Sequence, residues 1–352
     1  MSLQRIEGLS IKGVSVAIPK NVESNYDYDV IPENLRSRFI ESIGIEQRHI
    51  VEPGVCTSDL CYAAAQNLIT RLNWDKNEID LLVFVSQTPD YKMPATSCVL
   101  QHRLGLNNRI MAFDVSQGCT GYLYGLGIVG SLISSGQYKK ALLLVGNTQS
   151  LNTSYYDQSA YPLFGDAGSA TAIEFACSNS DRIVLGYYTE GAGANSIIIP
   201  DGGYRNPVNQ QSYIMEEFEG GIRRNRMNLK MVGDDVFSFV ISQVPKVVND
   251  LLTQEKVSYE DIDYLLLHQA SLFTCNSLRK KLRFPVEKTP YILSKFGNCS
   301  NASVPMLMAE SIKAQCLKGD LQLLVTSFGV GLSIACCLLH ISGLAVCDWI
   351  EV

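Results

Sequence analysis

The chain has 352 residues, of which 46% are hydrophobic and 18% charged, so it is long enough to bury a large core. Its net charge of −6 gives no general attraction for nucleic acid, which argues against a nucleic-acid-binding protein. No apolar run approaches the roughly 20 residues of a membrane span, and the first residues lack an apolar secretory segment, so we expect a cytoplasmic protein without a membrane partner.

Helical and strand-like patterns alternate along the chain. Helical periodicity is present at residues 60–72 and 236–252, and residues 119–136 are apolar on nearly every face, as in a fully buried helix. Four short apolar runs are typical of buried strands: residues 81–86, 141–146, 265–268 and 323–327. This alternation predicts an α/β fold with mostly parallel sheets covered by helices.

Two parts of the chain resemble each other at one offset. The helix-like segments 119–136 and 302–319 are each followed by a strand-like run. Cys119 and Ala302 are separated by 183 residues, as are Gly136 and Gly319. We therefore predict two similar halves, residues 1–176 and 177–352. Residues 195–232, rich in Asn, Gly, Arg and Gln, fit the repeat poorly and are expected to form a surface insertion beside a pocket mouth.

Cys119 is the first candidate functional residue. It stands where the strand-like run before it gives way to the apolar helix, and the glycines of that helix predict close contacts, for example with the equivalent helix 302–319. A thiol at a helix N-terminus is close to the positive end of the helix dipole, which favours the nucleophilic thiolate. The alternative is a small buried core cysteine, one of 11 in the chain.

The other cysteines indicate neither a disulfide framework nor a metal site. They form no Cys-x-x-Cys pair, and the four histidines are scattered along the chain. We expect free thiols in a reducing compartment, and no bound metal.

Two polar residues of the second half complete a possible site. His268 ends the strand-like run 265–268, where a side chain can face a pocket at the sheet's carboxyl edge. Asn298 lies in a glycine-containing turn thirty residues later. Each has a structural alternative, since a histidine there can be a buried structural residue and an asparagine a turn or helix cap.

Cys119, His268 and Asn298 together resemble the thiolase-like condensing enzymes, above all the β-ketoacyl-acyl-carrier-protein synthase III family, which carries a Cys-His-Asn triad in this order. The motifs that carry the resemblance are Gly118-Cys119-Thr120-Gly121, His268-Gln269-Ala270, Gly297-Asn298, Phe164-Gly165-Asp166-Ala167-Gly168 and Ser327-Phe328-Gly329-Val330-Gly331. The resemblance extends over nearly the whole chain.

The resemblance implies a duplicated thiolase-like fold with five layers, α-β-α-β-α, and a homodimer. It implies that Cys119 takes an acyl group from a thioester, and that a malonyl thioester on acyl carrier protein then loses carbon dioxide and attacks it. His268 and Asn298 would stabilise the enolate oxygen, and the backbone N–H groups of Cys119 and Val330 would form the oxyanion hole. The pathway would be fatty acid or specialised lipid or polyketide synthesis, with no tightly bound cofactor.

The chain departs from the family at positions that contact coenzyme A. Arg38, Ser42, Gln158 and Phe273 occupy places where other members have a Trp or Arg. The acyl donor could therefore be acyl-coenzyme A or an acyl carrier protein. Lys280 and Lys281 match positions that help to dock the acidic carrier protein, and a small basic patch can attract an acidic partner. The alternative is an ordinary solvated helix face.

Two other functions remain open. The first is an acyltransferase of the same fold that passes the acyl group of Cys119 to a non-malonyl acceptor, as the altered coenzyme A positions suggest. The second is a non-catalytic partner subunit, which is disfavoured because this chain retains Cys119, His268 and Asn298.

Overall fold

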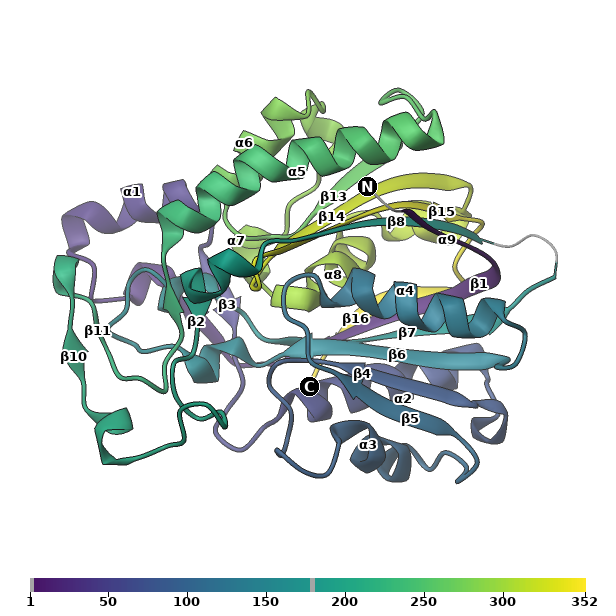
Figure 1. Ribbon diagram of the computed structural model, residues 1–352, viewed down its shortest axis with the longest axis horizontal. Helices are drawn as coiled ribbons and strands as arrows, with labels where there is room; N and C mark the ends of the chain where they lie inside the picture. The colour runs from purple at the N-terminus through teal and green to yellow at the C-terminus, as the bar shows by residue number, and fades with distance from the viewer. Residues whose placement is uncertain (1–2, 178–180) are drawn as a thin grey trace.

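The computed structural model describes residues 3–177 and 181–352, and its helical layers alternate with layers of strands (Figure 1). The outer helices on one side are α5 (Gly233–Glu255) and α6 (Leu272–Lys281), and on the other side α2 (Thr57–Leu72) and α3 (Thr96–Leu104). Between the sheets lie α4 (Gly121–Ser134) and α8 (Ser303–Glu310). The expected five-layered α/β fold is confirmed.

The strands form two sheets that share β1. The first has the order β16 (Val346–Glu351), β1 (Leu3–Ile18), β7 (Ala167–Phe175), β6 (Lys140–Asn147), β4 (Leu81–Val85) and β5 (Met111–Val115). The second continues from β1 through β8 (Asp181–Thr189), β15 (Ser333–Ile341), β14 (Leu321–Gly329) and β13 (Tyr264–Leu267). Residues 3–6 and Leu9 of β1 pair with β8, and residues 9–17 pair with β7, so one strand joins the two sheets.

Strand direction corrects one expectation, because the sheets are mixed rather than mostly parallel. β4 is parallel to both β5 and β6, and β13 is parallel to β14, as expected for strands that a helix connects. β15 instead follows β14 after three residues and is antiparallel to it. So short a connection permits only a hairpin, which explains the antiparallel pairing.

The remaining elements are short or lie at the edges of this core. The helices are α1 (Glu33–Ile43), α7 (Leu293–Phe296) and α9 (Lys313–Lys318). The short strands are β2 (Val22–Ser24), β3 (Gln47–His49), β9 (Ile197–Ile198), β10 (Glu216–Glu217), β11 (Arg223–Arg224) and β12 (Lys230–Met231). Among the described residues, no helix is both long and apolar enough to cross a membrane.

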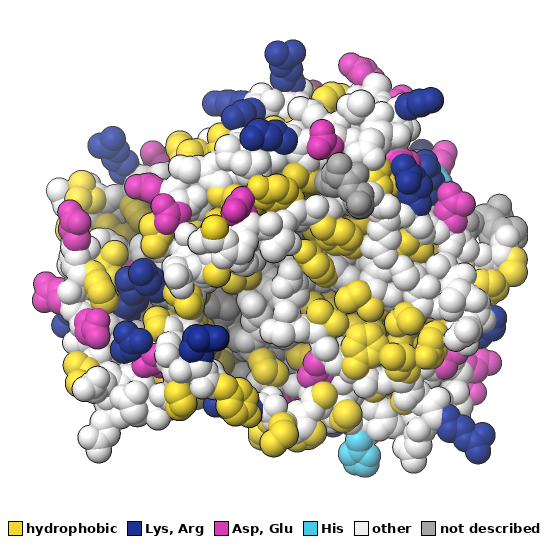
Figure 2. Space-filling view, viewed as in Figure 1, with side chains coloured by type: hydrophobic (Ala, Val, Ile, Leu, Met, Phe, Trp, Pro, Cys, Tyr) yellow, Lys and Arg dark blue, Asp and Glu magenta, His cyan; other side chains and the backbone are white. Residues whose placement is uncertain are grey.

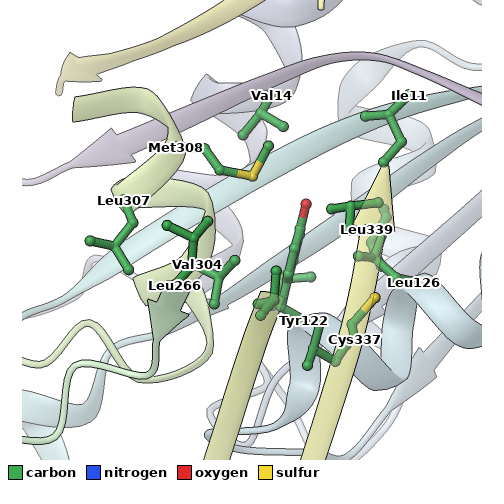
Figure 3. Close-up of a cluster of buried hydrophobic side chains, with 14 of the residues drawn as sticks. Ile11, Val14, Tyr122, Leu126, Leu266, Val304, Leu307, Met308, Cys337 and Leu339 are labelled. Atoms are coloured by element: carbon green, nitrogen blue, oxygen red, sulfur yellow. The ribbon is translucent and has the colours of Figure 1, made fainter. Parts of the chain in front are cut away.

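Helix α4 is buried over most of its surface but not on every side, because Tyr124, Ile128 and Leu132 are partly exposed and Ser131 and Ser134 are exposed. This corrects the expectation of burial on nearly every face. Tyr122 and Leu126 of α4 pack with Val304 and Leu307 of α8 and with side chains of β1, β13 and β15 (Figure 3). A methyl group on Gly125 would lie 2.7 Å from Leu143 of β6, so this glycine allows close packing of the helix on the sheet. We had expected this close contact to be with the equivalent helix, but the glycine instead approaches a strand.

The segment equivalent to α4 is not one continuous helix. A short 3-10 turn (Ser300–Ala302) precedes α8, and Ile312 separates α8 from α9. Ile312 has a φ of −128°, outside the helical range, and its side chain is buried in the core. The helix is thus interrupted at a residue whose apolar side chain is buried in the core.

The insertion 195–232 forms an outer excursion at the left of Figure 1, where β10 and β11 lie. Arg224 anchors it through a buried ion pair with Asp157, at 2.9 Å. Its interior also contributes buried side chains, such as Ser212 and Leu229, and Ile197 and Met231 near its ends line a pocket described below. The division of the chain at 176/177 stays a prediction. It falls beside residues 178–180, which lie outside the described residues, and β16 of the second half completes the first sheet.

Replacement of Leu126 by Ala tests the buried central helix. The side chain is fully buried, and we expect the substitution to lower the free energy of unfolding by about 3 kcal/mol, because it removes apolar contacts and leaves a cavity. Chemical denaturation measures the effect. Leu35→Ala is the matched control, since Leu35 is 51% exposed and its loss should change stability by less than about 0.5 kcal/mol. Equal effects of the two substitutions would contradict the buried position of α4.

Candidate active site

Cys119 lies in the turn between β5 and α4, just before the first turn of the helix. The N–H of Gly121 donates to the carbonyl of Gly118 at 2.6 Å, which closes the turn. Thr120 fixes it from the side, because its hydroxyl accepts from Gln117 Nε2 at 2.8 Å and lies 3.1 Å from the Ser333 hydroxyl. The thiol is thus held at the end of a strand, facing the second half of the chain.

Two opposing effects act on the pKa of the Cys119 thiol. Burial raises the pKa, whereas hydrogen bonds from the backbone of Val330, from its own backbone and from the Ser300 hydroxyl lower it. Burial is the largest effect, and the pKa is raised. The helix start alone suggested the opposite direction, because sequence does not show how completely the protein surrounds the sulfur.

The loop after β14 brings backbone against the thiol. A methyl group on Gly329 would lie 2.5 Å from Cys119 Sγ, so only glycine allows this approach, and its φ of 154° is one that other residues rarely adopt. Val330 follows it, with its side chain against Gly118. The predicted oxyanion groups, the N–H groups of Cys119 and Val330, both act on the same sulfur.

His268 immediately follows β13. Its N–H donates to the carbonyl of Thr326 at 2.8 Å, and its ring packs edge-to-face on Phe328 at 5.4 Å between centroids. Burial lowers the pKa of the imidazole to about 4, while a backbone hydrogen bond with Ser300 opposes the shift. The ring is therefore neutral near pH 7. Its Nδ1 is buried and has no hydrogen-bond partner among the described residues.

Asn298 is fixed by its backbone and by one side-chain oxygen. Its N–H donates to Leu163 at 2.8 Å, and its carbonyl accepts from Gly165 at 3.1 Å. The side-chain Oδ1 accepts from the N–H of Ser300 at 2.9 Å. The amide nitrogen is therefore the part of this side chain left to donate to a bound molecule.

Cys119, His268 and Asn298 line one pocket of about 190 Å³. Its other lining residues are mostly apolar, namely Leu163, Phe164, Ile197, Met231, Gly233, Val236, Phe237, Val240, Ala270, Ser271, Thr274, Phe328 and Gly329. Such a pocket fits an acyl chain and a few polar atoms that fix its reacting end. Their positions at the ends of predicted elements and the family resemblance suggested the three residues, and the fold brings them together from distant parts of the chain.

Two residues near the thiol were missed. The Ser300 hydroxyl acts on Cys119, and Asn147 at the end of β6 donates to Ser300 Oγ at 2.9 Å. Ser300 is two residues after Asn298, so its place near the site could have been found from the motif. Asn147 carried no comparable signal.

Two of the positions at which the chain departs from the family, Gln158 and Phe273, make defined contacts in the structure. Gln158 donates to the carbonyl of Gly220 at 3.0 Å, which ties it to the excursion. Phe273 is 58% exposed and packs on Phe237, a lining residue, with 5.1 Å between ring centroids. Arg38 and Ser42 are both exposed residues of α1, and Ser42 is in its last turn. The pocket mouth therefore presents aromatic surface at a position where the resemblance implied a cation.

Basic side chains lie at the C-terminal end of α6, the helix whose first turn contributes Thr274 to the pocket. Lys280 and Lys281 are exposed at the end of α6, followed by exposed Arg283. Figure 2 shows Lys and Arg side chains along the upper edge of the molecule, over the layer that contains α5 and α6. Within residues 3–177 and 181–352, no group of three or more His, Cys, Asp or Glu side chains is arranged to hold a metal ion.

The pKa of His268 predicts how stability depends on pH. The folded pKa of about 4 is below the ordinary value of 6.5, so the unfolded chain takes up this proton first as the pH falls. The stability that neutral His268 contributes is present above pH 6.5 and is lost between pH 6.5 and 4. We expect His268→Asn to reduce the loss of unfolding free energy between pH 7 and 4.5 by on the order of 2 kcal/mol. Denaturant titrations at both pH values measure it, and an equal loss in the two proteins would contradict the buried neutral ring.

Comparison with known proteins gives a consistent result. Residues 113–193 match the family model described as 3-oxoacyl-acyl-carrier-protein synthase III, and residues 252–341 match the model of its C-terminal part. A β-ketoacyl-acyl-carrier-protein synthase III from Syntrophomonas wolfei is 33% identical over 328 residues, covering 92% of this chain and 95% of that protein. A protein from Campylobacter jejuni, named as a putative 3-oxoacyl-acyl-carrier-protein synthase 3, is 34% identical over 342 residues, covering 94% and 93%.

The similarity extends to solved structures. The crystal structure of a 3-oxoacyl-acyl-carrier-protein synthase from Burkholderia xenovorans LB400 superimposes with a TM-score of 0.92, at 33% identity, over 100% of this chain and 99% of that one. Sequence and structure thus agree along the whole length. The chain belongs to the 3-oxoacyl-acyl-carrier-protein synthase III family of condensing acyltransferases.

Proposed function

We propose that this protein condenses an acyl group with a malonyl thioester, and that Cys119 is the nucleophile. The observation that carries the proposal is the meeting of Cys119, His268 and Asn298 in one apolar pocket. Each of the three offers the kind of atom that one step of the reaction requires: a nucleophilic sulfur, and hydrogen-bonding nitrogens where negative charge develops.

In the first half-reaction the sulfur of Cys119 attacks the carbonyl of an acyl thioester. A carbon–sulfur bond to Cys119 forms, the bond to the donor's sulfur breaks, and the donor leaves as a thiol with the proton that Cys119 loses. The negative oxygen of the intermediate needs donors that are already in place, and the N–H groups of Cys119 and Val330 are the nearest candidates.

In the second half-reaction a malonyl thioester loses carbon dioxide. The electrons of the broken carbon–carbon bond pass into an enolate, whose oxygen can interact with His268 and the amide nitrogen of Asn298. The α-carbon then attacks the acyl group, and Cys119 leaves as a thiolate. Because decarboxylation creates the nucleophile, no side chain has to remove a proton from carbon. This suits a neutral imidazole with a pKa of about 4.

The malonyl group would arrive on an acyl carrier protein, as the names of the relatives suggest. Carriers of this class are acidic, and the exposed Lys280 and Lys281 at the end of α6 are the residues that we propose to meet one. The acyl donor would be an acyl-coenzyme A or an acyl carrier protein, and the reaction would need no tightly bound cofactor.

A homodimer is the assembly we propose. β5 ends the strand order, so its outer edge has no partner strand among the described residues. Met93, between β4 and α3, is 80% exposed, and Met111 of β5 is 43% exposed. A second copy that pairs along β5 would cover both the edge and these apolar groups. Sedimentation at the mass of one chain would contradict this assembly.

Acylation of Cys119 tests the central proposal. Intact mass measured after incubation with acyl-coenzyme A and acyl-carrier donors should show one acyl adduct on the unaltered protein and none on Cys119→Ala. Cys299→Ala is the matched control, because Cys299 is a buried cysteine next to Asn298 and should leave the adduct unchanged. Acylation of Cys119→Ala would refute the mechanism.

The same acylated protein distinguishes the alternative acyltransferase. Addition of malonyl-carrier protein should release one carbon dioxide per acyl group and give a β-ketoacyl product. Transfer to an alcohol or amine, without carbon dioxide from any malonyl thioester, would favour an acceptor other than malonyl.

Charge reversal tests the docking surface. The double substitution Lys280→Glu and Lys281→Glu should raise the KM for malonyl-carrier protein about tenfold, with kcat nearly unchanged, because it acts on association rather than on the reacting atoms. Lys313→Glu with Lys318→Glu, on exposed positions of α9, is the control. An equal rise of KM in both pairs would show a general effect of charge and no specific docking surface.

A further inference from the structure

Ser300 has an unusual backbone conformation beside the reacting sulfur. It is buried, and its φ of 50° is in the left-handed region, which residues other than glycine rarely adopt. This conformation lets one residue serve both partners, because its hydroxyl reaches Cys119 while its backbone hydrogen-bonds to His268. Uncommon conformations of this kind are typical of functional sites, where the surrounding structure maintains them.

Asn147 determines which way the Ser300 hydroxyl points. The Oδ1 of Asn147 accepts from the N–H of Gln87 at 2.9 Å and from the Ser86 hydroxyl at 3.0 Å. Because a backbone N–H can only donate, the oxygen of the amide must face it, and the amide nitrogen must face Ser300. Ser300 Oγ therefore accepts from Asn147, which leaves its own hydrogen free for the sulfur of Cys119.

The surroundings of Cys119 make this donor important. His268 is the one other titratable side chain that lines the described pocket, and it is neutral near pH 7. The lining contains no Lys, Arg, Asp or Glu among the described residues. A thiolate formed here has no positive side chain beside it, so neutral donors have to stabilise the charge.

We propose that Ser300 is a catalytic residue that donates a hydrogen bond to the thiolate of Cys119, and that Asn147 is a positioning residue that orients this donor. The inference rests on the proposed role of Cys119 as nucleophile. The hydrogen bond would act twice: it stabilises the thiolate before acylation, and it stabilises the same thiolate when Cys119 leaves during condensation. No atom of Ser300 is transferred in either step.

Alkylation of Cys119 by iodoacetamide, followed as a function of pH, measures the effect directly. In Ser300→Ala we expect the midpoint of the pH–rate profile to move up by about one pH unit. Alkylation would be about tenfold slower below the midpoint and unchanged on the alkaline plateau, because a hydrogen bond to a charged group has been lost. A merely structural role would alter the plateau or the stability rather than move the midpoint.

Three further variants make the outcome decisive. Ser300→Gly keeps the positive φ without cost and should show the same shift, so it also replaces Ser300→Ala if that variant does not fold. Ser303→Ala is the matched control, since its buried hydroxyl has no partner among the described residues, and its profile should be unchanged. Asn147→Ala should give a smaller shift, and none in addition to that of Ser300→Ala, because it acts through Ser300.

A midpoint that does not move in folded Ser300→Gly would overturn the inference. This failure is distinct from failure of the proposed function, because alkylation needs neither acyl donor nor malonyl thioester. If the unaltered protein is never acylated but the midpoint shifts, the condensation proposal fails and the hydrogen bond stands. If acylation occurs but the midpoint does not shift, the hydrogen-bond proposal fails and the condensation proposal stands.

Discussion

The burial of one helix between two sheets is the constraint on which the site depends. α4 has almost no polar side chain to expose, so it is stable only when both sheets and α8 cover it. Its glycines let the strands approach closely, and the turn closed by Gly118 and Gly121 marks where the helix begins. Cys119 is placed by that beginning, and the strands on the far side of the helix end at His268 and at the loop containing Gly329. The packing thus brings together groups from distant parts of the chain.

The same packing determines the electrostatics of the site. A sulfur surrounded by protein has a raised pKa, and a buried imidazole has a lowered one, so the charged forms of both are disfavoured together. The site is therefore composed of neutral donors aimed at places where charge appears only during the reaction. In such a water-poor pocket each of these donors is worth more than it would be in solution.

Much of this could be predicted from sequence, for reasons that concern particular residues. The apolar run of α4 and the strand-like runs around it indicated an α/β fold with a largely buried helix, because a segment with few polar residues has to be covered, and the family resemblance implied the five layers. The ends of elements made Cys119, His268 and Asn298 candidates, and the resemblance of their motifs to the synthase III family joined them into one site. The mixed direction of the sheets, the break at Ile312 and the role of Asn147 were not found. The direction of β15 depends on a three-residue connection, and the break depends on the backbone angle of one residue. The role of Asn147 depends on its contact with Ser300. None of these features leaves a periodic pattern in the sequence.

The sharing of β1 between the sheets has a consequence for how the chain is made. Along residues 13–18, one edge of β1 pairs with β16, which is formed by residues 346–351 near the C-terminus. At synthesis rates of about 5–20 residues per second, this edge of β1 is exposed for tens of seconds before its partner leaves the ribosome. During that time the nascent chain presents an open, apolar strand edge of the kind that pairs with other chains. β1 therefore stays unpaired along this edge until β16 has been synthesised. During this interval the edge has to be protected from pairing with other chains.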